Sequence, residues 1–138
     1  MQAMEISRTG LDVEWRRLEV IAQNLANVST TRTAAGGPYR AMRLVSGPRG
    51  AFAKMMGAEG PAAGVTVYGV EPEGLAPRRV YEPGHPHADA DGYVSYPGID
   101  HAAEMSLMVT TARAYEANIV ALNAARQMYE KATELGKR

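Results

Sequence analysis

The stretch AAEMSLMVTTARAYEANIVALNAARQMYEKATELG, residues 102–136, decides the fold. It holds no proline, and no glycine before Gly136, so it predicts one long helix over Ala102–Leu135. At ~1.5 Å per residue this helix is on the order of 50 Å long, far longer than a compact domain of this size needs. Its apolar side chains recur every three or four positions and predict a narrow seam on one face: Met105, Met108, Ala112, Tyr115, Ile119 and Leu122.

A second seam lies near the N-terminus. The residues from Ala3 to about Val28 contain no proline and one interior glycine, Gly10, and predict another long helix. Its apolar positions again share one face: Met4, Leu11, Leu18, Ile21, Leu25 and Val28. We expect the two helices to pair in a coiled-coil-like arrangement, with neighbouring subunits covering the rest of each seam. A plain antiparallel helix pair inside a monomeric α+β domain is an equal alternative, because periodicity alone does not separate the two.

The segment between the helices has a different composition. Residues 36–98 hold all eight prolines and twelve of the fourteen glycines of the chain, which indicates turns and short strands. Gly47–Gly64 carries the weakest strand signal, and we expect a loop or protrusion there. The fold class expected is therefore α+β, with long terminal helices and a small β-rich central insert. Four runs rich in β-branched residues and tyrosine predict its strands: Tyr39–Val45, Val65–Val70, Arg78–Tyr81 and Tyr93–Tyr96.

Composition excludes several classes of function. The formal net charge is zero, and both signs are spread evenly, so neither nucleic-acid binding nor direct lipid binding is expected. The chain has no cysteine, which removes disulfides and thiolate metal sites. No apolar run approaches the roughly 20 residues that span a bilayer. Charged residues interrupt the N-terminus at Glu5, Arg8 and Asp12, so a cleaved secretory signal is not expected either.

One run, HPHADAD at residues 85–91, resembles a metal site in composition. His85, His87, Asp89 and Asp91 could offer imidazole and carboxylate ligands, and a small metal-dependent hydrolase would be the corresponding enzyme. Alternating residues of an extended segment point to opposite faces, however, and proline restricts the backbone. A turn in which aspartate side chains bond to nearby backbone amides is the stronger interpretation, so we expect no metal site, no catalytic residue and no cofactor.

Three ordered motifs resemble the bacterial flagellar basal-body rod protein family, and specifically its proximal-rod members. They are IAQNLANVSTTRTAAGGPYR at residues 21–40, VYEPGHPHADADGYVSYPGID at 80–100, and the helix EMSLMVTTARAYEANIVALNAARQMYEKATELG at 104–136. His87 and Gly98 depart from the residues usual in the family. The positions that carry the resemblance are Asn24, Asn27, Thr31, Gly37, Pro38, Tyr39, Gly84, His85, Pro86, Tyr115, Glu116 and Asn118.

The resemblance implies a non-enzymatic axial subunit that assembles into the torque-transmitting, export-permissive rod. Residues 1–35 would form the N-terminal assembly helix and export region, 36–100 the Gly/Pro-rich β insert, and 101–138 the C-terminal assembly helix, all in one structural unit. Implied partners are other rod subunits, the adaptor between the MS ring and the rod, copies of the chain itself, and the flagellar type III export apparatus. The implied location is the periplasm-spanning rod, reached from the cytoplasm without a cleaved signal peptide. The implied assembly interface is Met4, Leu11, Leu18, Ile21, Leu25, Met105, Met108, Tyr115, Ile119 and Leu122.

An alternative from another class is a cytoplasmic flagellar export chaperone or adaptor that binds partner helices. A central segment rich in glycine and proline argues against it.

Overall fold

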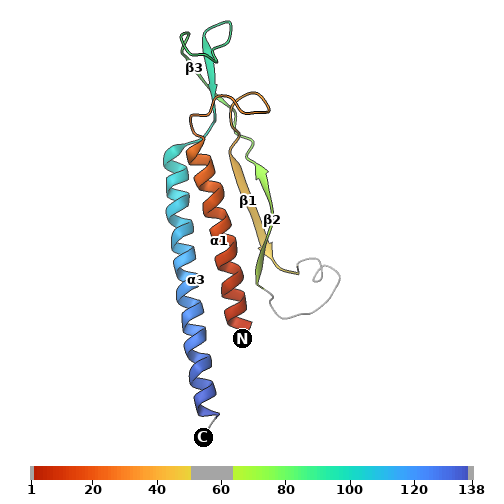
Figure 1. Ribbon diagram of the computed structural model, residues 1–138, viewed down its shortest axis with the longest axis vertical. Helices are drawn as coiled ribbons and strands as arrows, with labels where there is room; N and C mark the ends of the chain where they lie inside the picture. Colours follow the sequence, from red (N-terminus) through yellow and green to blue (C-terminus); the bar gives the residue numbers. More distant parts are fainter. Residues whose placement is uncertain (1, 51–63, 137–138) are drawn as a thin grey trace.

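Two long antiparallel helices dominate the computed structural model, which describes residues 2–50 and 64–136 (Figure 1). Helix α1 spans Gln2–Ala26 and helix α3 spans His101–Leu135, within two residues of the predicted bounds at each end. Two small antiparallel sheets lie between them in the chain, which confirms the α+β class. The helices pack along one another for the length of α1 (Figure 1). A coiled-coil geometry for this pair stays a prediction.

The first sheet is a hairpin of β1 (Met42–Pro48) and β2 (Val65–Pro72) that lies along α1. The prediction for the first of these strands was wrong in its bounds. β1 begins at Met42 instead of Tyr39 and continues through Pro48, because its backbone pairs with β2 until Pro48 faces Val65. The expected loop Gly47–Gly64 therefore loses its first two residues to a strand, and residues 51–63 of it lie outside the described part of the chain.

The second sheet sits beyond the ends of the helices, at the tip of the molecule (Figure 1). It pairs β3 (Arg78–Tyr81) with β4 (Tyr93–Tyr96), and both strands have the predicted bounds. Asp89 closes the loop between them, since its Oδ1 accepts hydrogen bonds from the backbone amides of Asp91 at 3.0 Å and Tyr93 at 2.8 Å. These bonds hold the pKa of Asp89 below its ordinary value, the Tyr93 amide contributing most, with help from an ion pair to Arg79.

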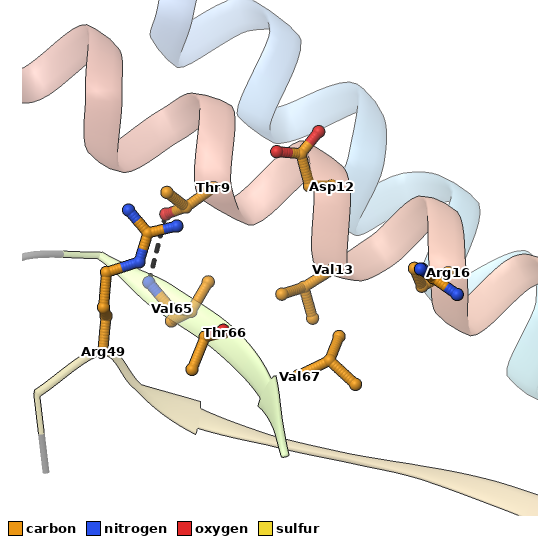
Figure 2. Close-up of a pocket in the computed structure, with 8 residues that line it drawn as sticks. All are labelled: Thr9, Asp12, Val13, Arg16, Arg49, Val65, Thr66 and Val67. Carbon is orange, nitrogen blue, oxygen red and sulfur yellow. Dashed lines mark hydrogen bonds between the residues drawn. The ribbon is translucent and has the colours of Figure 1, made fainter. Parts of the chain in front are cut away.

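The order of the layers is α3, then α1, then the β1–β2 hairpin (Figure 1). Val13 and Val20 of α1 meet Leu44 of β1 in the main apolar cluster, which Met42, Val65 and Val67 complete. Thr9 fixes the far end of this contact, because its hydroxyl donates to the carbonyl of Ile6 at 2.7 Å and accepts from the amide of Val65 at 3.1 Å (Figure 2). Helix α1 therefore has two covered sides, one against α3 and one against the hairpin.

Helix α3 begins and ends with identifiable caps. The Asp100 carboxylate accepts hydrogen bonds from the amides of Ala102 at 3.0 Å and Ala103 at 3.3 Å, which satisfies two of the free amides at a helix start. Gly136 ends the helix as predicted, with its amide bonded to the carbonyl of Ala132. Its backbone keeps right-handed helical angles, φ −75° and ψ −8°, so the left-handed conformation common at such a glycine is absent here.

Candidate assembly surface

Asn24 joins three parts of the chain at the upper end of the helix pair. Its side chain is fully buried, and its Oδ1 accepts from the amide of Met42 at 2.9 Å and the hydroxyl of Tyr39 at 3.1 Å. Its Nδ2 donates to the carbonyl of Met42 at 2.9 Å and to Oε2 of Glu104 at 3.2 Å. All four hydrogen-bonding positions of the amide are thus used. A polar residue on an apolar helix face is therefore explained by the contact of α1 with β1 and α3.

Glu104 is the residue of α3 that takes part in this contact between α1, β1 and α3, which we call the junction. The residue is 2% exposed, and its carboxylate pairs with the guanidinium of Arg43, whose Nη2 also lies 2.9 Å from Oε2 of Glu73. The hydrogen bond to Glu104 raises the pKa of Arg43. Burial, with the nearby Glu104 charge, raises the pKa of Tyr39. A buried carboxylate in the first turn of α3 is thus neutralised by a cation from β1 and lies near the positive end of the helix dipole.

The loop that follows α1 places Tyr39 at this junction, where its hydroxyl bonds to Asn24. Gly36 and Gly37 both have left-handed backbone angles, φ +79° and +75°, which allow the chain to reverse within the motif. The Tyr39 amide then donates to the carbonyl of Thr30 at 3.0 Å. Asn27 closes the end of α1 locally, because its Nδ2 donates to the carbonyl of Gln23 at 2.8 Å. The motif at residues 21–40 thus forms the turn that follows α1.

The central motif lies in the loop between β3 and β4. Gly84 and Pro86 are exposed, and His85 is half-buried. Thr31 Oγ1 lies 2.8 Å from Nδ1 of His87, so the loop after α1 and the tip loop meet. The His85 Nδ1 accepts from the backbone amide of His87 at 3.0 Å, which uses one imidazole nitrogen for the turn itself. Within residues 2–50 and 64–136, no three potential ligands come together in a way that could hold a metal ion.

A small cavity between α1 and the hairpin offers no catalytic arrangement. Its volume is about 150 Å³, its floor is valine side chains, and its rim carries Asp12, Arg16 and Arg49 (Figure 2). Thr9 and Thr66 both line it, and the Thr9 hydroxyl is already bonded to two backbone groups. We interpret the cavity as a packing gap beside the start of β2.

The predicted assembly residues do not all lie at the α1–α3 contact. Ile21 is buried, at 1% exposure, whereas Met105 and Ile119 are exposed at 42% and 37%. The remaining seven are half-buried: Met4, Leu11, Leu18, Leu25, Met108, Tyr115 and Leu122. The observed contact of α3 with α1 uses Glu104 and Thr111, both buried, and Asn118, so the predicted seam is rotated toward one edge of the contact.

Helix α1 approaches α3 closely at Gly10. A Cβ atom placed there would lie 2.7 Å from Oδ1 of Asn118, nearer than two such atoms can come. The Asn118 amide is held in place by donating to the carbonyl of Ala114 at 3.0 Å. Asn118, one of the motif residues, thus packs against the only glycine inside α1, and Glu116 of the same motif is exposed.

An open cleft with both polar and apolar lining lies on the side of the helix pair away from the hairpin. Trp15 lies two residues after Val13, about 200° around the helix from the side that faces the hairpin. Its ring is 6.1 Å from that of Tyr115, and with Leu11 these side chains line an open cavity of about 400 Å³ whose other walls are Asp12 and Arg16. Trp15 is 56% exposed.

Sequence reasoning missed Trp15, Arg43 and Glu104 as members of these contacts. Trp15 stands outside the heptad positions of the seam, although an exposed tryptophan on an amphipathic helix is itself a signal of a contact surface. Arg43 and Glu104 are 61 residues apart, and no local pattern pairs them. Among the described helices, none is long and apolar enough to cross a membrane.

The comparisons with known proteins agree with one another. A family model described as "Flagellar basal body rod FlgEFG protein C-terminal" matches residues 90–135. The chain is 36% identical to the flagellar basal-body rod protein FlgC of Borreliella burgdorferi, over 94% of this chain and 93% of that protein. It is 36% identical to FlgC of Salmonella typhimurium, over 99% and 98%, and 33% identical to FlgC of Bacillus subtilis, over 98% and 97%. These relatives do not favour the chaperone alternative.

Proposed function

Because the chain belongs to the FlgC family of flagellar basal-body rod proteins, we propose that it builds the proximal part of the rod through its two terminal helices. Family membership makes it a structural subunit of the flagellar basal body and not an enzyme. In this proposal, residues 1–35 and 101–138 carry assembly, and the β insert lies outside them. The assembled rod transmits torque and leaves a path for later subunits.

The observation that carries the proposal is the apolar surface that the subunit leaves open. Helix α1, of 25 residues, buries three apolar side chains, Val13, Val20 and Ile21, and α3, of 35 residues, buries none. Exposed large apolar side chains on α1 and α3 include Trp15, Met105 and Ile119. Large apolar side chains left exposed along both helices are typical of a helix pair that contacts other proteins. Assembly with neighbouring rod subunits would remove it from water.

The proposed partners follow from this arrangement and from the family. Other rod subunits and copies of the chain would contact the seam residues, and the adaptor between the MS ring and the rod would contact the end of the assembly. The type III export apparatus would deliver the chain without cleavage of a signal peptide. None of these contacts requires a nucleic acid, a lipid or a cofactor.

The test is a charge placed in each seam, in a strain that lacks the chromosomal gene. Ile119→Asp puts a carboxylate on an exposed seam position, and Leu18→Asp puts one at a half-buried position. We expect both variants to abolish swimming and to be absent from purified rods. Secretion of the chain should stay measurable. Ala117→Asp, on the exposed side of the same helix, is the matched control and should keep motility. Normal swimming of the Ile119→Asp strain would contradict the interface assignment.

A further inference from the structure

Two histidines in the tip loop, residues 82–92 between β3 and β4, use the same ring nitrogen for different partners. Nδ1 of His85 accepts a hydrogen bond from the backbone amide of His87 at 3.0 Å. Nδ1 of His87 lies 2.8 Å from Oγ1 of Thr31, in the loop after α1. A backbone amide can only donate a hydrogen bond, whereas a hydroxyl can donate or accept one. The two rings should therefore differ in how they respond to a proton.

The bond made by His85 exists only while its imidazole is neutral. The His87 amide needs a lone pair on Nδ1, so the single proton of the neutral ring lies on Nε2. This assignment leaves the neutral ring without a free lone pair for a metal ion. Protonation adds a hydrogen to Nδ1, which then points at the amide hydrogen and can no longer accept. The bond is thus present on the alkaline side of the imidazole titration and absent on the acid side.

The bond made by His87 survives protonation. In the neutral ring, Nδ1 can accept the hydroxyl proton of Thr31, and in the charged ring it donates to the Thr31 oxygen after the hydroxyl rotates. Imidazole is the side chain whose charge ordinarily changes between about pH 5 and pH 8. Of the two bonds, only the one made by His85 must break across this range.

The groups around His85 carry charges of both signs. Its ring faces the Tyr96 ring of β4 at 6.4 Å and the His87 ring at 5.4 Å. The Arg78 guanidinium of β3 lies over the Tyr96 ring at 5.6 Å, and the Glu82 carboxylate accepts from the Tyr96 hydroxyl at 2.9 Å. The carboxylate favours a positive imidazole, whereas the guanidinium and a protonated neighbouring imidazole oppose it. Because these effects have opposite signs, the loss of the acceptor at Nδ1 is the specific difference between the two states.

The bond between His87 and Thr31 connects the tip loop to the rest of the subunit. Within residues 2–50 and 64–136, the second sheet has no extensive contact with α1 or α3. In the same described residues, the tip loop makes one side-chain hydrogen bond outside residues 78–96, and its partner is the uncharged Thr31. The turn held by His85 fixes the backbone of His87 and so positions the ring that reaches Thr31.

We propose that His85 is a pH-sensitive switch that attaches the tip loop to the loop after α1. When His85 is neutral, it fixes the turn at His87, and the bond to Thr31 forms. When it is protonated, the turn is released and that bond weakens. Asp89 closes the other end of the tip loop and stays ionised over this range, because its pKa lies below the ordinary value. The switch therefore frees the loop without unfolding the second sheet, and it is independent of the rod function proposed above.

The test is nuclear magnetic resonance of the full chain, labelled with the heavy isotope of nitrogen, between about pH 8 and pH 5. At the alkaline end, a scalar coupling across the N–H···N bond should join the His87 amide nitrogen to Nδ1 of His85. We expect this coupling to disappear as the His85 ring becomes protonated, with a matching upfield shift of the His87 amide proton. Nuclear Overhauser contacts between Thr31 and the His87 ring should weaken over the same titration.

Three results of this titration would overturn the proposal. The coupling could be absent at the alkaline end, or it could persist once the His85 ring is charged. The His85 ring could also stay neutral down to about pH 5, in which case it does not switch in the range of an ordinary imidazole.

Two variants of His85 separate the acceptor from the charge. His85→Asn places an amide oxygen where Nδ1 was, and asparagine commonly accepts a hydrogen bond from the backbone two residues on. Because asparagine does not titrate, this variant should keep the contacts between Thr31 and His87 at every pH. His85→Ala has no acceptor and should lose those contacts at every pH.

His101→Asn is the matched control, since it removes an exposed histidine outside the tip loop and should leave the wild-type titration unchanged. Far-UV circular dichroism should be the same for the wild type and all three variants. Two outcomes would contradict the switch: acid-weakened contacts of Thr31 in His85→Asn, or contacts that persist at alkaline pH in His85→Ala.

Discussion

Asn24 and Glu104 are 80 residues apart in the chain, and their side chains meet at 3.2 Å inside the protein. This single contact joins the last turns of α1 to the first turn of α3, and through Arg43 and Met42 it includes the start of the hairpin. The junction holds together three elements whose buried apolar cluster is small. Its side chains should therefore dominate the stability of the isolated subunit.

Replacing Asn24 by alanine should be strongly destabilising. The change removes four hydrogen bonds and leaves the half-buried amide and carbonyl of Met42 without a side-chain partner. We expect a loss of about 2–4 kcal/mol in the free energy of unfolding, measured by urea denaturation. Asn123→Ala, at an exposed position of α3, is the matched control and should change it by less than about 0.5 kcal/mol. Equal effects of the two variants would contradict the role given to Asn24.

The ion pair between Arg43 and Glu104 should show energetic coupling. Glu104→Gln removes a charge that is 2% exposed and leaves the Arg43 cation partly buried. We expect a loss of roughly 2 kcal/mol for the single variant, and a coupling of about 1–2 kcal/mol in a double-mutant cycle with Arg43→Gln. The exposed pair of Arg126 and Glu130 is the comparison, with an expected coupling below about 0.5 kcal/mol.

Gly10 should tolerate a side chain only when Asn118 is shortened. Alanine favours a helix over glycine by up to about 1 kcal/mol, but its Cβ would meet the Asn118 amide at 2.7 Å. We expect Gly10→Ala to give no gain in the wild type and a gain of about 0.5–1 kcal/mol in an Asn118→Ala background, measured by thermal unfolding. A gain of the same size in both backgrounds would show that the helices are not in close contact there.

The tip loop should weaken in acid. The folded protein holds the pKa of Asp89 below its ordinary value, so the ionised carboxylate stabilises the loop. This contribution is fully present above about pH 4, near the pKa of an unfolded aspartate, and is lost as the pH falls through the lower value of the folded state. Asp89→Asn should therefore speed hydrogen exchange at the Tyr93 amide at pH 6, by a factor that shrinks below about pH 4. Asp91→Asn, in the same loop, should leave that exchange nearly unchanged.

The sequence predicted the elements well where the signal is local. Both helices and the strands Arg78–Tyr81 and Tyr93–Tyr96 follow from periodicity, from β-branched residues and from the positions of glycine and proline. The bounds of β1 were missed because its last residues, Gly47 and Pro48, disfavour strands, and only pairing with β2 keeps them extended. Pairing with β2, which is remote in the chain, here outweighs the low strand propensity of these two residues.

The contact between α3 and α1 was harder to predict, for a related reason, and the assembly interface stays a prediction. Heptad spacing finds an apolar face but not the direction in which a partner lies. The buried contact of α3 with α1 includes Glu104 and Thr111, which an apolar pattern cannot find, and the seam with Ile119 lies at its edge. Asn24 belongs to the same contact and is also invisible to an apolar pattern, although its side chain is fully buried.

The position of α1 between α3 and the hairpin means that α1 is synthesised well before one of its two packing partners, α3. The ribosome adds Asn24 early, and it adds the hydrogen-bond partner Glu104 80 residues later. At roughly 5–20 residues per second this is a delay of about 4–16 s on the ribosome, during which one side of α1 has nothing to pack against. Closing so long a loop also costs entropy before any contact repays it. A nascent chain shortened by its last helix should thus stay open and protease-sensitive.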